Sequence, residues 1–283
     1  MKIITSISDM QRIADALRRE GKRISVVPTM GFLHEGHLSL MRIAKEKSDV
    51  VIMTIFVNPT QFAPNEDFSK YPRDLERDMR LIESAGREIL FTPSEKDMYP
   101  ENYVTFVNVE RITGVLEGKS RPTHFRGVTT VVAKLFNITK PHVAVFGQKD
   151  AQQAVVLKQM ARDLNFDVDI IVAPIVREAD GLAMSSRNVY LSTSERKSAP
   201  VLYRSLQHAK QLVEQSERNC RTIIEAMTKM ITTEPSAQID YISIADSTAL
   251  NELSTLKKGD AVLISVAVHF DTTRLIDNII ITA

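Results

Sequence analysis

Short apolar runs alternate with amphipathic stretches over the first part of the chain. Helix-spaced apolar positions separate the runs, in residues 36–47, 74–85, 128–138 and 151–164. An earlier helix is expected from a capping box formed by Ser8 and Gln11, and Gly21 can end it. Strands that alternate with helices in this way predict a parallel sheet covered by helices on both faces. The predicted strands are Ile24–Val27, Val50–Val57, Glu88–Phe91, His142–Phe146 and Val168–Val172.

The rest of the chain has a different order of elements. Helical spacing in residues 194–215 and 220–231 is followed by three strand-like runs, Ile239–Ala245, Ala261–His269 and Asn278–Ile281. The last two runs are joined across Asp271–Thr273. Helices followed by consecutive strands predict a small α+β unit. We therefore predict an α/β fold class, with a Rossmann-like parallel-sheet domain over residues 1–176 and a smaller α+β C-terminal domain over residues 177–283.

The segment Pro28–His37 directly follows the first buried strand and then enters a helix. Gly36 lets the backbone approach a ligand that any Cβ would push away. The unpaired N–H groups and the positive dipole end of the new helix favour anionic oxygens. His34 and His37, three residues apart on one helical face, can donate hydrogen bonds to the same phosphate chain. This segment therefore predicts a site for a nucleotide triphosphate.

Unusual polar residues also follow three other predicted strands. Asn58–Gln61 comes after the second strand of the series, and Gly147–Asp150 comes after the fourth. Pro174 and Val176 follow the fifth. Open parallel sheets bind ligands beyond the carboxyl ends of their strands. We therefore expect all four clusters to face one cavity.

Composition and charge narrow the functional classes. The 283 residues carry a formal net charge of +1 with scattered basic residues, which does not favour a nucleic-acid groove. The single cysteine, Cys220, leaves no partner for an intramolecular disulfide and no cysteine metal cluster. The longest apolar stretch is far too short for a membrane span, and no signal peptide is recognisable. We expect a soluble, cytoplasmic protein without nucleic-acid or membrane partners.

Each of these motifs also has an ordinary structural interpretation. A pair of histidines on a helix is often part of a surface or core, and Lys149 alone could be a solvated lysine. Two histidines without further ligands do not make a zinc site. Gly114–Ser120 is similar to a P-loop, but it has three residues instead of four between its glycines, and no helix is expected after it. The order and context of the motifs taken together favour the functional interpretation.

The string Pro-Thr-Met-Gly-x-Leu-His-x-Gly-His at residues 28–37 resembles the pantothenate synthetase family of the nucleotidylyltransferase superfamily. The matching block continues to Leu40, and further blocks lie at residues 56–62, 71–73, 121–125, 147–150 with 152–153, and 180–188. The resemblance implies an ATP-dependent ligase that condenses pantoate with β-alanine to pantothenate through a pantoyl-adenylate intermediate, releasing AMP and pyrophosphate. It also implies Mg²⁺, a homodimer, and a smaller domain that closes over the nucleotide.

The resemblance implies roles for individual residues by position. The catalytic set around the triphosphate would be His34, His37, Lys149, Ser185, Ser186 and Arg187. The ATP-binding set would add Met30, Gly36, Gly147, Asp150, Val176 and Met184. Pantoate would be bracketed by Gln61 and Gln153, with Met30, Asn58, Tyr71 and Arg121 nearby. Asp78 would help to hold magnesium, although its neighbour Arg77 stands where relatives can carry a second acid.

Three other functions fit parts of the pattern. An adenylyltransferase could stop after transferring the nucleotide, for example to a phosphate ester; AMP release that requires an amine acceptor would separate the two. A nucleotide sensor could bind ATP without turnover, which a pyrophosphate-release assay distinguishes. A tRNA-charging enzyme would need a nucleic-acid-binding surface, and no anticodon-type domain, basic surface or aromatic-rich stretch indicates one.

Overall fold

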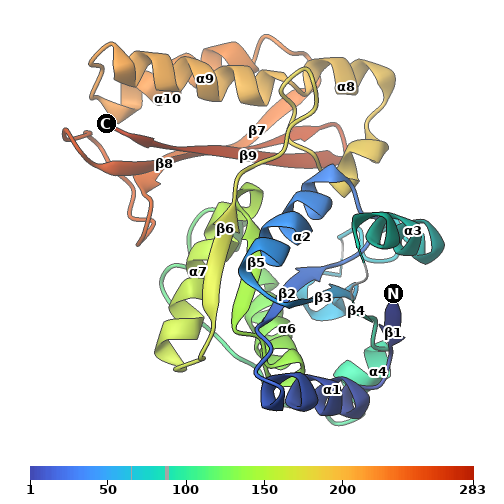
Figure 1. The fold of residues 1–283 in the computed structure, drawn as a ribbon. Helices are drawn as coiled ribbons and strands as arrows, with labels where there is room; N and C mark the ends of the chain where they lie inside the picture. The colour runs from blue at the N-terminus through green and yellow to red at the C-terminus, as the bar shows by residue number, and fades with distance from the viewer. Residues whose placement is uncertain (65, 87–88) are drawn as a thin grey trace. The chain divides into compact units, whose positions relative to one another are not determined.

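The computed structural model describes residues 1–64, 66–86 and 89–283. The chain forms two compact units (Figure 1). The first comprises residues 1–147 and 156–174, and the second comprises residues 148–155 and 175–283. The eight residues 148–155 therefore belong with the C-terminal part of the chain. The two functional domains expected at 1–176 and 177–283 stay a prediction.

The first unit contains a six-stranded sheet in which every pairing is parallel. Its spatial order is β1-β4-β3-β2-β5-β6. The strands are β1 (Lys2–Ile4), β2 (Ile24–Thr29), β3 (Val50–Ile55), β4 (Ile89–Phe91), β5 (Val143–Gly147) and β6 (Asp169–Ala173). The predicted α/β class is confirmed, and β1 is an additional edge strand. The predicted beginning of β4 at Glu88 lies outside the described residues.

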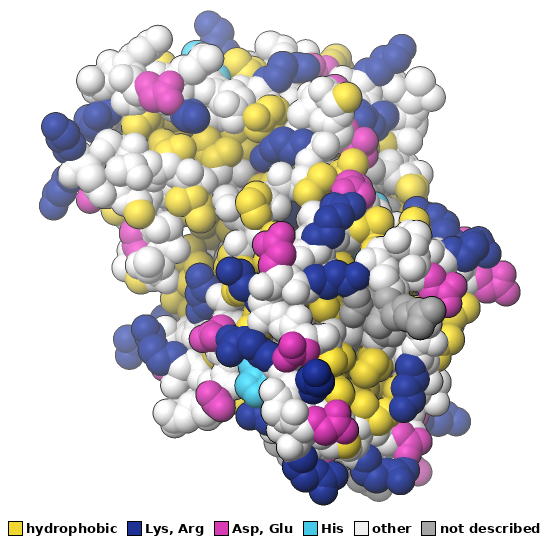
Figure 2. All heavy atoms as spheres, viewed as in Figure 1, with side chains coloured by type: hydrophobic (Ala, Val, Ile, Leu, Met, Phe, Trp, Pro, Cys, Tyr) yellow, Lys and Arg dark blue, Asp and Glu magenta, His cyan; other side chains and the backbone are white. Residues whose placement is uncertain are grey.

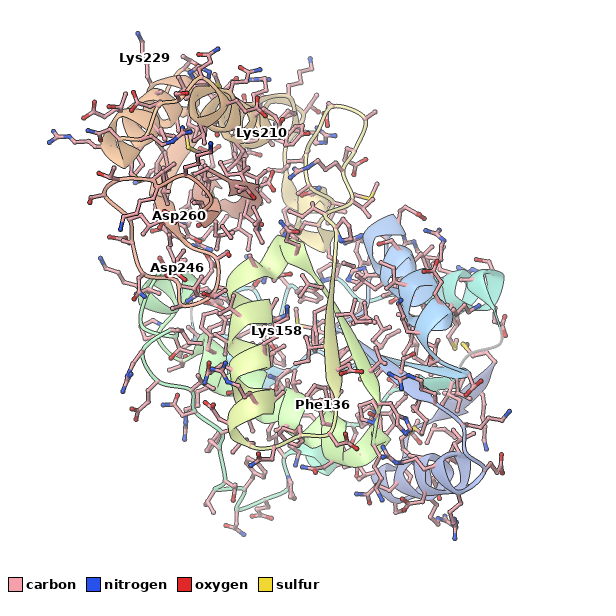
Figure 3. The ribbon with its side chains drawn as sticks, turned by 60° about the vertical axis from the view of Figure 1, so that its left-hand side comes forward. Phe136, Lys158, Lys210, Lys229, Asp246 and Asp260 are labelled. Atoms are coloured by element: carbon pink, nitrogen blue, oxygen red, sulfur yellow. The ribbon has the colours of Figure 1, made fainter. Side chains whose placement is uncertain are left out.

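Helices cover both faces of this sheet (Figure 1). On one face, α1 (Ile7–Arg19), α6 (His124–Thr139) and α7 (Ala151–Asp163) enclose a core that includes Phe136, labelled in Figure 3. On the other face, α2 (Glu35–Lys47) and α3 (Leu75–Ala85) pack on β2, β3 and β5. The shorter helical elements of the first 150 residues are η1 (Pro59–Gln61), α4 (Glu95–Met98), α5 (Glu117–Ser120) and η2 (Gln148–Asp150).

The first helix begins two residues earlier than the sequence predicts. Ser6, with an extended backbone at φ −80° and ψ 130°, is the N-cap, and its hydroxyl accepts a hydrogen bond from the backbone N–H of Asp9 at 3.3 Å. The predicted capping box of Ser8 and Gln11 is wrong, because Ser8 already lies inside the helix. The predicted end is correct: Gly21 follows the helix with φ +72°, a conformation that glycine adopts without strain.

The second unit contains an antiparallel sheet of β7 (Ala237–Asp246), β8 (Ala261–Phe270) and β9 (Thr273–Thr282), in that order. Helices α9 (Val201–Glu214) and α10 (Cys220–Ile231) pack on one face of this sheet (Figure 1). The single helix predicted over 194–215 is wrong. It is divided into α8 (Thr193–Ser198) and α9 at Pro200, which has no N–H to continue the helical ladder. A short η3 (Ser186–Tyr190) precedes them.

The order of the parallel strands reverses at β2. β3 and β4 lie on one side of β2, and β5 and β6 lie on the other. β2 and β5 are direct neighbours, with Val26 opposite Ala144. Such a reversal is where open α/β sheets bind ligands, beyond the carboxyl ends of the strands. The chain leaves these ends at Met30 and at Gln148, so two of the predicted clusters begin at the reversal.

The surface is mixed in charge. Basic and acidic side chains are interspersed over the face drawn in Figure 2. Among the helices in the described ranges, none combines the length and the apolar character that a membrane crossing requires.

Candidate active site

The turn after β2 has an unusual backbone that a buried carboxylate holds in place. Gly31 has φ +84°, and a Cβ there would lie 3.0 Å from Ile55 and 3.1 Å from Asp78. The next residue, Phe32, also has a positive φ of 51°. The two oxygens of Asp78 accept hydrogen bonds of 2.7 Å from the backbone N–H groups of Phe32 and Leu33. Asp78 therefore fixes the turn that leads into the histidine pair.

The histidine pair stands at the beginning of α2. His34 is the N-cap residue, and the ring centroids of His34 and His37 are 4.1 Å apart. The backbone N–H of His34 donates to Nδ1 of His37 at 3.2 Å. An accepting Nδ1 puts the proton of a neutral His37 on Nε2, which makes that nitrogen a donor. Gly36 lies in the first turn of the same helix, as expected for a segment that presents N–H groups to an anion.

The structure gives Asp78 a clear role in the turn, and its expected magnesium contact stays a prediction. Its side chain is 1% exposed, and burial raises the pKa of the carboxyl while the two backbone N–H groups oppose that shift. Nη1 of Arg77 lies 3.6 Å from Oδ1 of Asp78. Within residues 1–64, 66–86 and 89–283, no group of three or more histidine, cysteine or acidic side chains could hold a metal ion.

A second part of the candidate site is built around Gln61, which is 9% exposed. Its Oε1 accepts a hydrogen bond from Nδ2 of Asn58 at 3.0 Å, and its Nε2 lies 3.3 Å from the sulfur of Met30. Asn58 is buried and also donates to the carbonyl of Gly127, while its Oδ1 accepts from the Tyr99 hydroxyl at 2.7 Å. Three of the residues expected near pantoate are thus in contact. The network orients the Gln61 amide so that its NH₂ group lies on the Met30 side.

Arg121 holds the same loop from the other side. Its guanidinium makes hydrogen bonds of 2.7 and 2.6 Å to the two carboxylate oxygens of Glu66, and it also donates to the carbonyl of Gln61 at 3.2 Å. Burial opposes ionisation of Glu66, but the Arg121 pair outweighs it and lowers the pKa of that carboxyl. Tyr71 is buried and packs edge-on against Phe62, 6.0 Å between ring centroids. These contacts give Arg121 a role in positioning Gln61; contact of Arg121 or Tyr71 with pantoate stays a prediction.

Sequence reasoning missed two residues that support this loop. A Cβ on Gly127 would lie 2.4 Å from the carbonyl oxygen of Thr60 and 2.5 Å from the backbone nitrogen of Gln61, so only glycine lets η1 approach α6 this closely. The pKa of Tyr99 is raised to about 12 by burial, so its hydroxyl stays a hydrogen-bond donor to Asn58. Gly127 precedes the predicted helix, and nothing local marked it as a contact point.

His124 is also part of this network. Burial and the nearby Arg121 lower its pKa from 6.5 to about 4, so the ring is neutral at pH 7. Nδ1 lies 3.0 Å from the Gln61 carbonyl and Nε2 lies 3.3 Å from Nη1 of Arg121. A carbonyl can only accept, so the proton is on Nδ1, and Nε2 accepts from the arginine. Both ring nitrogens are satisfied only while the ring carries no charge.

The second unit carries the remaining expected residues. Val176 and Met184 are joined by a backbone hydrogen bond of 3.0 Å in a short hairpin. Gly181 in its turn has φ +94° and packs against Tyr203. Ser185 is the N-cap of η3 and accepts from the backbone N–H of Arg187 at 3.3 Å; Ser186 is buried. The hairpin thus leads directly into the Ser-Ser-Arg segment.

Lys149, Asp150 and Gln153 also lie in the second unit, at η2 and in the first turn of α7, whereas Gly147 ends β5 in the first unit. The expected ATP-binding residues are therefore distributed over both units. The structure brings residues together within each unit, and a common cavity for all four clusters stays a prediction.

Comparison with known proteins identifies the family. A model of the family described as pantoate-beta-alanine ligase matches residues 2–280. The chain belongs to this family. The resemblance noted from the motifs is thereby confirmed, and the family is one of enzymes. The chain is 55% identical over 281 residues to the pantothenate synthetase of Acetivibrio thermocellus, covering 99% of each chain. It is 56% identical over 281 residues to that of Heliobacterium modesticaldum, again covering 99% of each.

Solved structures of the pantoate-beta-alanine ligase family share the fold. The pantothenate synthetase of Thermus thermophilus superposes with a TM-score of 0.93 at 44% identity, covering 99% of each chain. The ligase of Francisella tularensis, described in complex with beta-gamma ATP and beta-alanine, gives a TM-score of 0.81 at 36% identity, covering 99% of this chain and 97% of that one. The parallel sheet with a smaller antiparallel unit is therefore the fold of the family.

The close approach at Gly127 leads to a first prediction. Gly127→Ala should destabilise the protein by about 1–3 kcal/mol, because the added methyl meets backbone atoms that cannot rotate away. This loss opposes the gain of about 1 kcal/mol that alanine normally brings to a helix. Urea unfolding measures the difference. Asn137→Ala, at an exposed position of the same helix, is the control and should not destabilise. An unchanged or higher midpoint for Gly127→Ala would contradict the contact.

The neutral His124 leads to a second prediction. In the unfolded chain the ring binds a proton below pH 6.5, whereas in the folded protein it does so only below about 4. As pH falls through this window the unfolded state binds more protons, so stability is lost, by an amount on the order of 3 kcal/mol. His124→Asn can keep a donor toward Gln61 and cannot titrate. Between pH 7.5 and pH 4.5, the free energy of unfolding should therefore fall more for wild type than for this variant.

Urea midpoints at pH 7.5, 5.5 and 4.5 check this expectation. Protonation of carboxylates such as Glu66 also destabilises the protein in acid. These carboxylates are present in both proteins, so their contribution cancels in the difference. A wild-type minus variant difference that is constant over the three pH values would show that His124 does not keep a depressed pKa.

Proposed function

We propose that the protein joins pantoate to β-alanine, using ATP and releasing AMP and pyrophosphate. The observation that carries this proposal is the hydrogen-bonded set of Asn58, Gln61 and Met30 beside the β2 turn that leads to His34 and His37. It combines a neutral amide donor with a segment suited to phosphate. The family's Francisella tularensis member, described in complex with beta-gamma ATP and beta-alanine, supports the same substrates here.

The first step is the transfer of AMP to pantoate. The pantoate carboxylate attacks the α-phosphorus of ATP, a P–O bond forms, and the bond to pyrophosphate breaks. The protein positions the two reactants and neutralises the charge that grows on the leaving group. We assign this work to His34, His37, Lys149, Arg187 and the hydroxyls of Ser185 and Ser186. Preorganised donors of this kind act on the transition state.

The second step is amide formation. The neutral amine of β-alanine attacks the carbonyl carbon of the adenylate, a C–N bond forms, and AMP leaves with the electrons of the C–O bond. Activation is needed because a free carboxylate has a poor leaving group, whereas AMP leaves as a stabilised phosphate ester. The ammonium form of β-alanine must lose one proton to become this neutral amine, and the nitrogen releases a second proton, to solvent or a base, as the amide forms. Gln61 and Gln153 are proposed to hold the hydroxyl and carboxylate oxygens of pantoate during both steps.

The remaining nucleotide contacts follow the same proposal. Met30 and Val176 would offer backbone groups to the nucleotide, and Gly147 and Asp150 would border its ribose and adenine. Gly36 would leave space for phosphate oxygens at the beginning of α2. Met184 joins Val176 in the short hairpin that precedes Ser185.

Magnesium is proposed to arrive with ATP. Each oxygen of Asp78 accepts one backbone hydrogen bond, so the carboxylate already has a structural role, and its contact with magnesium stays a prediction. Mg²⁺ retains water and binds phosphate oxygens readily, and needs few protein ligands. When bound to ATP it would supply positive charge at the phosphates.

Removing a phosphate-binding donor should slow the first step. We expect Lys149→Ala and His37→Ala to lose at least ~10²-fold in pantoate-dependent pyrophosphate release, the scale of losing one preorganised donor. Lys158, exposed on α7 and labelled in Figure 3, and His208 on α9 provide matched controls. Lys158→Ala and His208→Ala should keep the wild-type rate. Near-normal release in Lys149→Ala and His37→Ala would refute these roles.

Analysis of the reaction products separates the other functions. Mass analysis of a reaction with ATP, Mg²⁺, pantoate and β-alanine should show pantothenate and AMP in equal amounts. Pyrophosphate without an amide product, even with β-alanine present, would indicate an adenylyltransferase. ATP binding without pyrophosphate would indicate a sensor.

We also propose that the protein is a homodimer, as the family resemblance implies, and that it acts in the cytoplasm. Residues 103–110 form no helix or strand, and Val104 among them is an apolar side chain that is 83% exposed, so a second chain could cover it. Sedimentation equilibrium should give twice the chain mass of 31.8 kDa, and Val104→Asp should shift the equilibrium toward single chains. A wild-type mass of one chain at micromolar concentration would contradict the dimer.

A further inference from the structure

The backbone of Lys149 is held by an asparagine that comes 129 residues later in the chain. Nδ2 of Asn278, in β9, donates to the carbonyl of Gln148 at 3.0 Å and to the carbonyl of Lys149 at 2.9 Å. In return, Nε2 of Gln148 lies 3.3 Å from Oδ1 of Asn278. One side chain thus makes three hydrogen bonds to two successive residues of η2. All of these residues belong to the second unit.

Asn278 is itself fixed in place. It is 3% exposed and lies opposite Ser265 in the antiparallel sheet. Its backbone N–H donates to Oδ1 of Asp277 at 2.8 Å. Asp277 is 2% exposed and receives hydrogen bonds of 2.6 and 3.0 Å from the guanidinium of Arg177. The asparagine therefore projects from a rigid strand instead of a mobile loop.

The same strand also holds the second segment that carries proposed ATP-binding residues. Besides its bonds to Asp277, Arg177 donates to the carbonyl of Gly181 at 3.0 Å, and its guanidinium lies 4.0 Å from the ring centroid of Tyr203. This fixes the turn of the hairpin that ends at Met184. Two adjacent residues of β9 thus support η2 and the hairpin separately.

The chemistry of the site requires an amide. A carboxamide can donate two N–H bonds from one nitrogen and accept on its oxygen, which suits two carbonyls and one donor. A carboxylate of the same shape would put an oxygen against two carbonyl oxygens. An apolar side chain at position 278 would leave the two carbonyls and the Gln148 amide without these hydrogen bonds.

We propose that Asn278 is a positioning residue that sets the backbone of η2 and thereby aims the Lys149 ammonium. The inference rests on the proposed function, in which Lys149 stabilises the leaving pyrophosphate. A small rotation of η2 would move the ammonium, and misplacement by about 1 Å can cost on the order of 10²-fold in rate. Asn278 touches no reacting atom in this scheme and acts through Lys149.

The first test does not need the reaction. Hydrogen exchange followed by mass spectrometry should show faster exchange in peptides covering residues 148–153 of Asn278→Ala than in wild type. The expected increase is at least about fivefold, the equivalent of losing one hydrogen bond of ~1 kcal/mol. Peptides of β2 and α2 should exchange at the wild-type rate. Asn251→Ala, at an exposed position of the same unit, is the control. Unchanged exchange at residues 148–153 would overturn the proposal even if the proposed reaction were wrong.

The second test measures coupling to Lys149. Asn278→Ala and Asn278→Asp should lower kcat for pyrophosphate release about 10–10²-fold with little change in the KM for pantoate. In a Lys149→Ala background, the same substitution should change kcat less than about twofold, because the group that Asn278 aims is gone. If the Asn278 substitution lowers kcat by the same factor with and without Lys149, Asn278 has a general structural role, which would overturn the proposal.

A milder variant guards against misfolding. Gln148→Ala removes only the bond that Gln148 makes to Oδ1 of Asn278. It should lower kcat about fivefold, the effect of one hydrogen bond, and this loss should also disappear in the Lys149→Ala background. A full fivefold loss that persists without Lys149 would count against the proposal.

Discussion

Buried polar side chains have to satisfy the backbone of the loops that carry the candidate chemistry, because these loops leave the sheet and lose its hydrogen-bond ladder. Asp78 accepts from the turn that ends in Leu33. Asn58 ties its own loop to α6, and Asn278 donates to the carbonyl of Lys149. Each of these partners comes from a distant part of the chain. The loop geometry therefore exists only once the surrounding unit has folded, and the motifs alone do not contain it.

Most of the elements could be predicted because burial determines the order of apolar and polar residues along the sequence. Strands covered on both faces read as continuous apolar runs, and helices packed on one face read as a period of about 3.6 residues. The errors have local causes. Pro200 divides a stretch whose apolar spacing continues through it, and Ser6 rather than Ser8 has the extended backbone that an N-cap needs. The strand β1 has three residues, of which only Ile4 is buried, so it leaves no continuous apolar run in the sequence.

The supporting residues of the site could not be predicted in this way. Gly127 matters because η1 crosses α6 at that point, and a sequence pattern does not record a crossing. The sequence gives His124 an ordinary pKa of 6.5, and only burial next to Arg121 lowers that pKa to about 4, which keeps the ring neutral in mild acid as well. Asparagine side chains are usually exposed to solvent, and the sequence does not show that Asn278 is only 3% exposed. Asn58, Arg121 and Asp78 are named from the motifs as ligand contacts, and their roles in positioning the loops are visible only in three dimensions.

Arg121 shows how the protein itself can match the charge of an arginine in the candidate site. Its guanidinium already makes two hydrogen bonds to Glu66, and a substrate carboxylate that replaced Glu66 would break bonds worth about 1.5–3 kcal/mol each. The positive charge at this place is therefore matched within the protein. The proposed pantoate site depends instead on the neutral amide of Gln61, held by Asn58. A neutral donor accommodates a hydroxyl, whereas a phosphate ester would bring a second negative charge without a partner at that place. The charge balance of the loop thus favours a hydroxy acid as the acceptor of AMP.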